Sequence, residues 1–362
     1  MVKYPILKSN FMKNPLWYMR LVETGWVPDS VIRWVLQISF NLQIFRRNSH
    51  SIKKRSTAKR VLIQKLKNSP IAIRTNDPNR QHYEVPSEFF QLVLGKWLKY
   101  SCCYWPAGAI TLDEAEEAML DLTCRRARLE DGMRVLDLGC GWGSLSLWIG
   151  THYPGCNVLA VSYSKTQKEF IEKQSKLREL NNISVMTADM ADFESDRRFE
   201  QFPRFDRVIS VEMFEHMKNY ERLLKRISEL LDPDGKLFVH IFSHREFAHE
   251  FDADNPRDWM AQTFFSGGTM PSDDLLLHFQ RDLKIRDHWR IDGWHYQKTL
   301  QAWLAKLDAN KDAVRGVMAQ TYGPENETLW LSNWRLFFLS CSMAWGLKGG
   351  REYLVSHYLF EL

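Results

Sequence analysis

The sequence lacks the features of several protein classes. Its 6 cysteines among 362 residues form no C-x-x-C pair and no cluster with histidine at zinc-ligand spacing, so no metal is expected. No apolar run reaches the roughly 18 residues that a membrane-spanning helix needs. The first residues lack the basic, apolar, small-residue order of a secretory signal, and the chain has neither repeats nor low-complexity tracts. A globular, cytoplasmic protein with reduced thiols is therefore expected.

The chain also lacks the glycine pattern of dinucleotide-binding enzymes. Gly139, Gly141 and Gly143 stand at every second position, whereas the dehydrogenase pattern is G-x-G-x-x-G. An apolar run precedes Asp137 and an amphipathic helix start follows the glycines, which predicts the first strand–loop–helix unit of a nucleotide-type fold. Glycine allows a tight turn and lets a ligand lie against bare peptide N–H groups. The D-x-G-x-G-x-G pattern resembles motif I of the class I S-adenosylmethionine methyltransferases.

Charge is unevenly placed along the chain. The formal net charge is +5, yet residues 46–67 hold nine Lys or Arg and no acid, so the remainder is mildly acidic. A helix is predicted to start after Pro28, with Asp29 or Ser30 as its cap, and to run to Phe45. One interpretation is an amphipathic arm resting on an anionic membrane surface. The favoured interpretation is a helical arm packed on the main domain with a solvated charged face.

Alternating strand and helix patterns predict an α/β fold with a parallel, doubly wound sheet. Strands are expected before Asp137 and at residues 157–161, 183–187, 206–211 and 236–242, and a T-x-x-E capping box at Thr111 opens the helix before the first strand. Residues 1–80 are predicted to form the helical arm and basic linker, and residues 81–362 the main domain. Within that domain the sheet core spans about 110–245, and an aromatic-rich helical substrate cap spans about 246–362.

Polar residues follow several of these strands, where a doubly wound sheet binds its ligand. Ser162 ends the second strand in place of the acid that methyltransferases usually carry there, so Tyr163 and Gln167 are predicted to contact a ribose. Asp189 follows the third strand and could accept a hydrogen bond from an adenine amino group. Residues 81–90 and 98–105 are expected to lie over the cofactor as a lid.

Three titratable residues follow the fourth strand. Glu212, Glu215 and His216 have i, i+3, i+4 spacing and are predicted to share one face of a first helical turn. An alkylamine with a pKa near ~10 is protonated at neutral pH, and a buried carboxylate or histidine could remove that proton. The helix dipole alone also favours acids in a first turn. The adjacent histidine and the cofactor motif favour the catalytic interpretation.

Aromatic residues make up 13% of the chain, with 14 Trp. Trp334 and Phe338 lie one helical turn apart and are candidates for stacking on an aromatic or cationic substrate, with core packing as the alternative. Cys341 is interpreted as pocket lining, because free cysteine behaves as a small buried hydrophobic residue.

Taken together, several blocks carry a family resemblance. The blocks are HYEVPSEFF, LKYSCCYW, TLDEAEEAML, VLDLGCGWGSLSLWI, SKTQKEFI, VEMFEHMKNYE, GGTMPS and NWRLFF. From residue 81 onward the chain resembles the cyclopropane-fatty-acid-synthase superfamily of methyltransferases, and within it the coclaurine N-methyltransferase branch. The resemblance implies a class I methyltransferase fold that uses S-adenosylmethionine and releases S-adenosylhomocysteine. It also implies cofactor roles for residues of four blocks: Tyr100 and Ser101 at the methionine end, Gly139 and its neighbours at the backbone, Tyr163 and Gln167 at the ribose, and Asp189 and Met190 at the adenine.

The resemblance implies two activities. The E-x-x-E-H residues match those that N-methyltransferases place beside the reacting amine, which implies methylation of a small, benzylisoquinoline-like or other aromatic amine. The alternative is carbon methylation of unsaturated phospholipid chains. Cyclopropane synthases bind bicarbonate with residues whose counterparts are Cys102, Glu215, His240 and Tyr296. Glu212 favours N-methylation, since cyclopropane synthases have a small residue there.

Nucleic acid is not an expected partner. The basic segment would suit it, but base methyltransferases usually carry an Asn/Asp-Pro-Pro-aromatic motif where this chain has Val-Glu-Met-Phe. A non-enzymatic binding module is disfavoured because every cofactor-facing block is present. A small-molecule amine is the expected partner, and membrane contact through the arm and a homodimer are left open.

Overall fold

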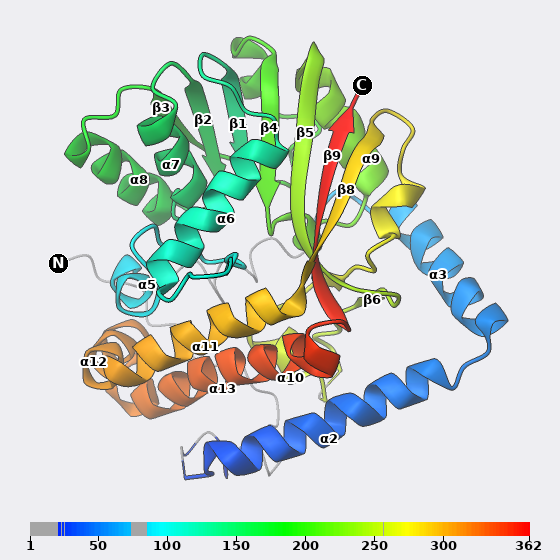
Figure 1. The fold of residues 1–362 in the computed structure, drawn as a ribbon, viewed down its shortest axis with the longest axis vertical. Helices are drawn as coiled ribbons and strands as arrows, with labels where there is room; N and C mark the ends of the chain where they lie inside the picture. The colour runs from blue at the N-terminus through cyan, green and yellow to red at the C-terminus, as the bar shows by residue number, and fades with distance from the viewer. Residues whose placement is uncertain (1–20, 23, 25, 74–84, 256) are drawn as a thin grey trace.

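A seven-stranded sheet forms the centre of the protein (Figure 1), a computed structural model that describes residues 21–22, 24, 26–73, 85–255 and 257–362. The predicted boundary at residue 81 and the first three residues of the HYEVPSEFF block lie outside the described residues. The strands, in spatial order, are β3 (Ile183–Thr187), β2 (Asn157–Ser162), β1 (Arg134–Leu138), β4 (Phe205–Val211), β5 (Leu231–His244), β9 (Tyr353–Glu361) and β8 (Lys284–Asp292). A separate pair joins β6 (His249–Glu250) to β7 (Thr269–Met270).

The doubly wound sheet is confirmed, but it is not wholly parallel. Strands β3, β2, β1, β4 and β5 are parallel neighbours. Strand β9 then pairs antiparallel with β5, and β8 antiparallel with β9. Both added strands come from the range predicted as cap, so that range also completes the sheet. The prediction missed them because β9 pairs with a strand more than a hundred residues earlier, and local patterns do not encode such pairing.

Helices cover both faces of the sheet (Figure 1). One face packs on α6 (Leu112–Arg126), α7 (Ser144–His152) and α8 (Lys165–Leu177), and the other on α9 (Tyr220–Leu230). Successive side chains of a strand point to opposite faces of the sheet, so Val135 packs toward α6 and α7 while Leu136 packs toward α9. The capping box at Thr111 is confirmed, with Thr111 N–H donating to the Glu114 carboxylate at 2.8 Å. Short 3-10 helices are η2 (Arg197–Gln201), η3 (Phe214–His216), η4 (Leu275–His278), η5 (Pro324–Asn326) and η6 (Leu347–Gly349).

The remaining helices lie at the carboxyl ends of the parallel strands. Figure 1 shows α11 (Gly293–Ala309) and α13 (Glu327–Trp345) beneath the sheet, with α2 (Asp29–Asn48) running alongside α13. Also among them are α5 (Ser87–Val93), α10 (Trp259–Thr263) and α12 (Lys311–Tyr322). None of the described helices is both long and apolar enough to traverse a bilayer.

The N-terminal arm consists of α2 (Asp29–Asn48) and α3 (Ile52–Lys67). The cap prediction is wrong: Pro28 occupies the cap position of α2, and no side chain caps the helix, because the helix already begins at Asp29. Four basic side chains of α3 pair with acids of the main domain: Arg55 with Glu246, Lys59 with Asp274, Lys65 with Glu250 and Lys67 with Glu221. The arm therefore packs on the main domain, as the favoured interpretation had it, but these four basic side chains are paired with acids and do not form the solvated charged face that it expected.

Candidate active site

The loop after β1 turns on three glycines. Gly139, Gly141 and Gly143 have φ of 87°, 54° and 79°, in the left-handed region that favours glycine. A Cβ on Gly139 would lie 2.7 Å from Met213, and one on Gly143 would lie 2.6 Å from Ile171. A Cβ on Gly141 would meet nothing within 4 Å. Gly143 therefore serves packing, whereas the backbone at Gly141 is open to a ligand.

Two small cavities, of about 70 and 100 Å³, flank this loop. Each is lined by residues predicted for the cofactor: Tyr100, Ser101 and Asp137 in the first, Tyr163 and Met190 in the second, and Gly139, Gly141 and Gln167 in both. The Gln167 amide oxygen accepts from Ser162 at 2.5 Å, while its buried Nε2 has no hydrogen-bond partner among the described residues. That N–H group is available to a bound molecule.

Two of the predicted cofactor residues are placed differently from the others. Asp137 is buried beneath the loop, where its carboxylate accepts from Ser146 at 2.6 Å, and burial raises its pKa to about 6. Asp189 accepts from Ala191 N–H at 2.8 Å and lines neither cavity. Asp137 thus braces the loop that the cofactor would contact, and an adenine contact by Asp189 stays a prediction.

A third cavity, of about 510 Å³, lies between the sheet and the cap helices. Its wall is mainly aromatic, with Phe242, Phe265, Tyr296, Trp303, Phe337 and Trp345. Helix α2 closes one side through Leu36, Phe40, Gln43 and Arg47, a contribution that sequence reasoning missed. The only signal for it was that these residues recur at i, i+4, i+7 and i+11.

Trp334 and Phe338 do not line this cavity. Both are fully buried in the aromatic core, where Trp334 packs on Phe89 with ring centroids 4.5 Å apart. The face of α13 that meets the cavity carries Phe337, Ser340, Cys341 and Ala344 instead. The core-packing alternative is therefore correct for Trp334 and Phe338, and Cys341 lies in the cavity wall. The small residues at helical spacing were the signal for the correct face.

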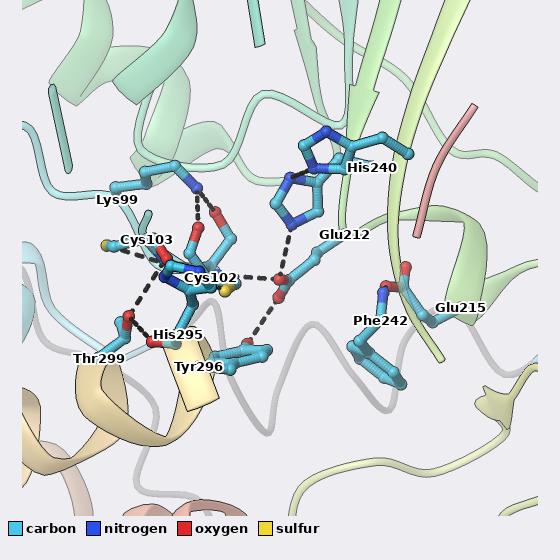
Figure 2. Close-up of polar contacts among 12 residues, drawn as sticks. Lys99, Cys102, Cys103, Glu212, Glu215, His240, Phe242, His295, Tyr296 and Thr299 are labelled. Atoms are coloured by element: carbon cyan, nitrogen blue, oxygen red, sulfur yellow. Dashed lines mark hydrogen bonds and ion pairs between the residues drawn. The ribbon is translucent and has the colours of Figure 1, made fainter. Parts of the chain in front are cut away.

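Glu212 lies where the three cavities meet, since it lines all of them. Tyr100 lines the first small cavity and the large one, and His216 lines the second small cavity and the large one. The Glu212 carboxylate accepts three hydrogen bonds (Figure 2): from Cys102 N–H at 2.9 Å, His240 Nε2 at 3.2 Å and Tyr296 OH at 2.7 Å. Three donors hold this carboxylate at the junction.

The predicted helical turn is wrong. Glu212 has a left-handed φ of 48° and precedes η3, so it does not share a face with Glu215. Glu215 is fully buried, and its Oε1 accepts from Phe242 N–H at 2.8 Å; Figure 2 shows the carboxyl group beside Phe242. Of the four bicarbonate counterparts, Cys102, His240 and Tyr296 therefore converge on the Glu212 carboxylate, and Glu215 does not join them.

The two carboxyl groups differ in charge. Burial raises the pKa of Glu212, opposed by Lys99 and by the hydrogen bonds from Cys102 and Tyr296. Burial and the negative charge of Glu212 raise the pKa of Glu215 well above its ordinary range. With three donors on one carboxylate and one on the other, Glu212 carries the negative charge and Glu215 its proton.

Two further side chains complete the electrostatics of the junction. Burial lowers the pKa of His216 to about 4, which leaves a neutral imidazole at pH 7, and its buried Nδ1 has no hydrogen-bond partner among the described residues. Lys99 is buried, and its Nζ donates to Ser101 at 2.5 Å and to the Cys102 carbonyl at 2.7 Å. Sequence reasoning gave Lys99 no role of its own, although it lies within the predicted lid at residues 98–105.

The sheet is doubly wound, a glycine loop follows β1, and a buried, negatively charged carboxylate follows β4. Together these features define a class I methyltransferase. Residues 72–345 match the family model described as mycolic acid cyclopropane synthetase, and the chain belongs to this family.

Relatives of known activity fall into two groups. (S)-coclaurine N-methyltransferase from Thalictrum flavum subsp. glaucum is 38% identical over 348 residues, which cover 95% of this chain and 94% of that protein. Cyclopropane-fatty-acyl-phospholipid synthase from Escherichia coli (strain K12) is 29% identical over 230 residues, 63% of this chain and 56% of that protein. The crystal structure of coclaurine N-methyltransferase bound to N-methylheliamine and SAH matches with a TM-score of 0.88 and 36% identity, over 95% of this chain and 99% of that one.

Proposed function

We propose that this protein is an S-adenosylmethionine-dependent N-methyltransferase acting on a small aromatic amine of the benzylisoquinoline type. The observation that carries the proposal is the position of Glu212, a buried carboxylate at the junction of a large aromatic cavity and two cavities beside the glycine loop. The coclaurine N-methyltransferase relative spans 95% of the chain, whereas the cyclopropane synthase relative spans 63%.

The residues beside the glycine loop fit the cofactor. The open backbone at Gly141 and the unpartnered Nε2 of Gln167 are available to a polar ligand. Tyr100, Ser101, Gly139 and Gln167 would hold S-adenosylmethionine, which supplies a methyl group on a positively charged sulfur.

The residues at the junction divide the remaining chemistry. The Glu212 carboxylate attracts the protonated amine and orients it toward the glycine-loop side. The His216 imidazole, whose protonated form is favoured by the negative charge of Glu212, takes the amine proton at Nδ1, which leaves a nitrogen lone pair to attack the methyl group. The aromatic wall, with Tyr296, Trp303 and Phe337, stabilises the methylated cation.

The alternative is carbon methylation with a bound bicarbonate. It is supported by the presence of Cys102, His240 and Tyr296. The hydrogen bonds that these residues would give to bicarbonate go to the Glu212 carboxylate. The Glu212 carboxylate thus occupies the donors that a bound bicarbonate would need. For this reason the N-methylation proposal is preferred.

Isotope-labelled cofactor distinguishes the two functions. Purified protein is incubated with labelled S-adenosylmethionine and either a panel of secondary and tertiary aromatic amines or vesicles of unsaturated phospholipid. We expect label only in amines, with products identified by mass spectrometry. Label confined to the vesicle lipids would refute the proposal.

We further infer that a second copy of the chain covers the outer face of α2. Val31, Val35, Ile38, Leu42 and Phe45 form an outward stripe, 39–71% exposed, whose alternating four- and three-residue spacing is typical of a helix–helix seam. The basic residues of α3 that pair with acids weaken the membrane alternative. Light scattering of wild type and Phe45→Glu is expected to show a dimer and a monomer. Flotation of the wild type with anionic vesicles would instead favour membrane contact.

A cytoplasmic location is part of this proposal. All six cysteines are free thiols, and five of them are buried. Such thiols suit a reducing compartment.

A further inference from the structure

Two histidines lie side by side beneath the Glu212 carboxylate. His240 of β5 and His357 of β9 are directly paired across the antiparallel ladder, so their side chains point to the same face of the sheet. Their rings lie 4.6 Å apart and are tilted by 37°, and both residues are fully buried. Glu212 is tied to the same strand, since its N–H donates to the His240 carbonyl at 2.8 Å.

A series of hydrogen bonds connects Glu212 with the end of α6. His240 Nε2 lies 3.2 Å from Glu212 Oε1, and His240 Nδ1 lies 2.9 Å from His357 Nε2. His357 Nδ1 in turn lies 2.9 Å from Nη1 of Arg126, the last residue of α6. The guanidinium of Arg126 also covers Trp289 of β8, 5.0 Å from the ring centroid.

Arg126 fixes the direction of every bond in the series. A guanidinium can only donate, so His357 Nδ1 must accept. A neutral imidazole carries one N–H, so the His357 proton is on Nε2 and is donated to His240 Nδ1. His240 then carries its proton on Nε2 and donates it to the Glu212 carboxylate.

Both rings are held neutral. Burial lowers the pKa of His240 and of His357 well below the ordinary histidine range, and the charges of Lys99 and Arg126 lower both further. The series also cannot carry a proton outward from Glu212, because the guanidinium at its far end cannot accept one. A proton taken from substrate must therefore leave on the cavity side, where His216 lies.

We propose that Arg126 is a remote positioning residue for Glu212, acting through His357 and His240. Its donor fixes one tautomer in each ring, so that His240 always presents an N–H to the carboxylate. Without it, His357 can carry its proton on Nδ1, and His240 can then turn a bare nitrogen toward Glu212. This proposal rests on the proposed function, in which Glu212 holds the amine.

Three variants test the series. Arg126→Met removes the donor at similar length, Arg126→Lys keeps a side chain that only donates, and Arg125→Met is the matched control. Arg125 is exposed and pairs only with Asp121 among the described residues. We expect Arg126→Met to lower kcat on the amine about ten-fold with cofactor Kd unchanged, Arg126→Lys to restore most of it, and Arg125→Met to match wild type. Equal kcat for wild type and Arg126→Met would overturn the proposal.

Nitrogen-15 NMR of the imidazoles tests the tautomers directly and needs no substrate. We expect protons on Nε2 of both His240 and His357 in the wild type and in Arg126→Lys, and a second tautomer in Arg126→Met. A proton on Nδ1 of either ring in the wild type would refute the directed series, even if Arg126→Met fails to fold. Failure of the proposed function would appear differently, as a wild type with the expected tautomers that methylates no amine.

Discussion

Two carboxyl groups three residues apart, Glu212 and Glu215, have opposite surroundings. Glu212 faces all three cavities and accepts three hydrogen bonds, whereas Glu215 faces the Phe242 backbone and lines none of them. We expect Glu212→Gln to lower kcat on the order of 10²-fold, because the charge that attracts the amine is lost. Glu215→Gln should stay within a few-fold of wild type, since the neutral amide replaces a protonated acid. Steady-state kinetics at saturating cofactor measure both, and the reverse order would show that Glu215 is the functional acid.

Adjacent phenylalanines of α13 separate substrate binding from stability. Phe338 is fully buried, so Phe338→Ala should cost about 3–5 kcal/mol in the free energy of unfolding. Phe337 is half-buried and lines the large cavity, so Phe337→Ala should raise KM for the amine with a smaller loss of stability. Thermal denaturation and amine titrations distinguish the two. A larger KM change for Phe338→Ala would place the cavity on the other side of α13.

At the residue scale, the sequence predicted which residues form the site better than how they point. Gly139, Gly141, Gln167 and Glu212 all line the cavities, because their motifs fix both strand end and residue type. The direction of Glu212 could not be predicted, since it depends on a left-handed φ and on donors from β5 and α11. The i, i+3, i+4 spacing assumes a regular helix, so it could not predict the left-handed backbone at Glu212.

At the scale of elements, helix α2 of the N-terminal arm lines the large cavity with one face and is exposed on the other. Phe40 of α2 is half-buried and lines the large cavity, while Phe45 on the same helix is 71% exposed. Phe40→Ala should therefore raise KM for the amine several-fold, with cofactor Kd unchanged. Phe45→Ala, the matched control, should leave KM at the wild-type value. Isothermal titration and kinetics test both, and equal effects would mean that α2 does not close the cavity in solution.

The elements themselves were predictable where their signal is local. The capping box of α6 and the five parallel strands follow from patterns within a few residues. Strands β8 and β9 could not be predicted in this way, because their hydrogen-bond partners are each other and β5. The aromatic residues in and around them also fit a helical cap. The large cavity depends on the same long-range arrangement, so its α2 wall could not be predicted either.

At the scale of the whole molecule, one buried carboxylate joins the cap segment to the edge of the sheet. Asp273 accepts from His288 at 3.0 Å and Arg290 at 2.7 Å on β8, and from Ser356 at 2.7 Å on β9. Burial alone would raise the pKa of Asp273, but the hydrogen bonds from these three residues lower it to about 2. The folded state thus favours the ionised carboxylate more strongly than the unfolded chain does.

The sign of the pH dependence follows from that lowered pKa. The stabilisation is fully present above the unfolded value near ~4 and is lost as pH falls toward about 2, because the unfolded chain then binds the proton first. Asp273→Asn should lose about 2 kcal/mol of unfolding free energy at neutral pH, and the difference from wild type should shrink as pH falls below about 4. Asp282→Asn is the control, because Asp282 pairs with Arg281 at the surface. Denaturation midpoints across pH measure the difference in stability between wild type and Asp273→Asn. A difference that grew on acidification would show that the ionised Asp273 carboxylate does not join the cap segment to the sheet.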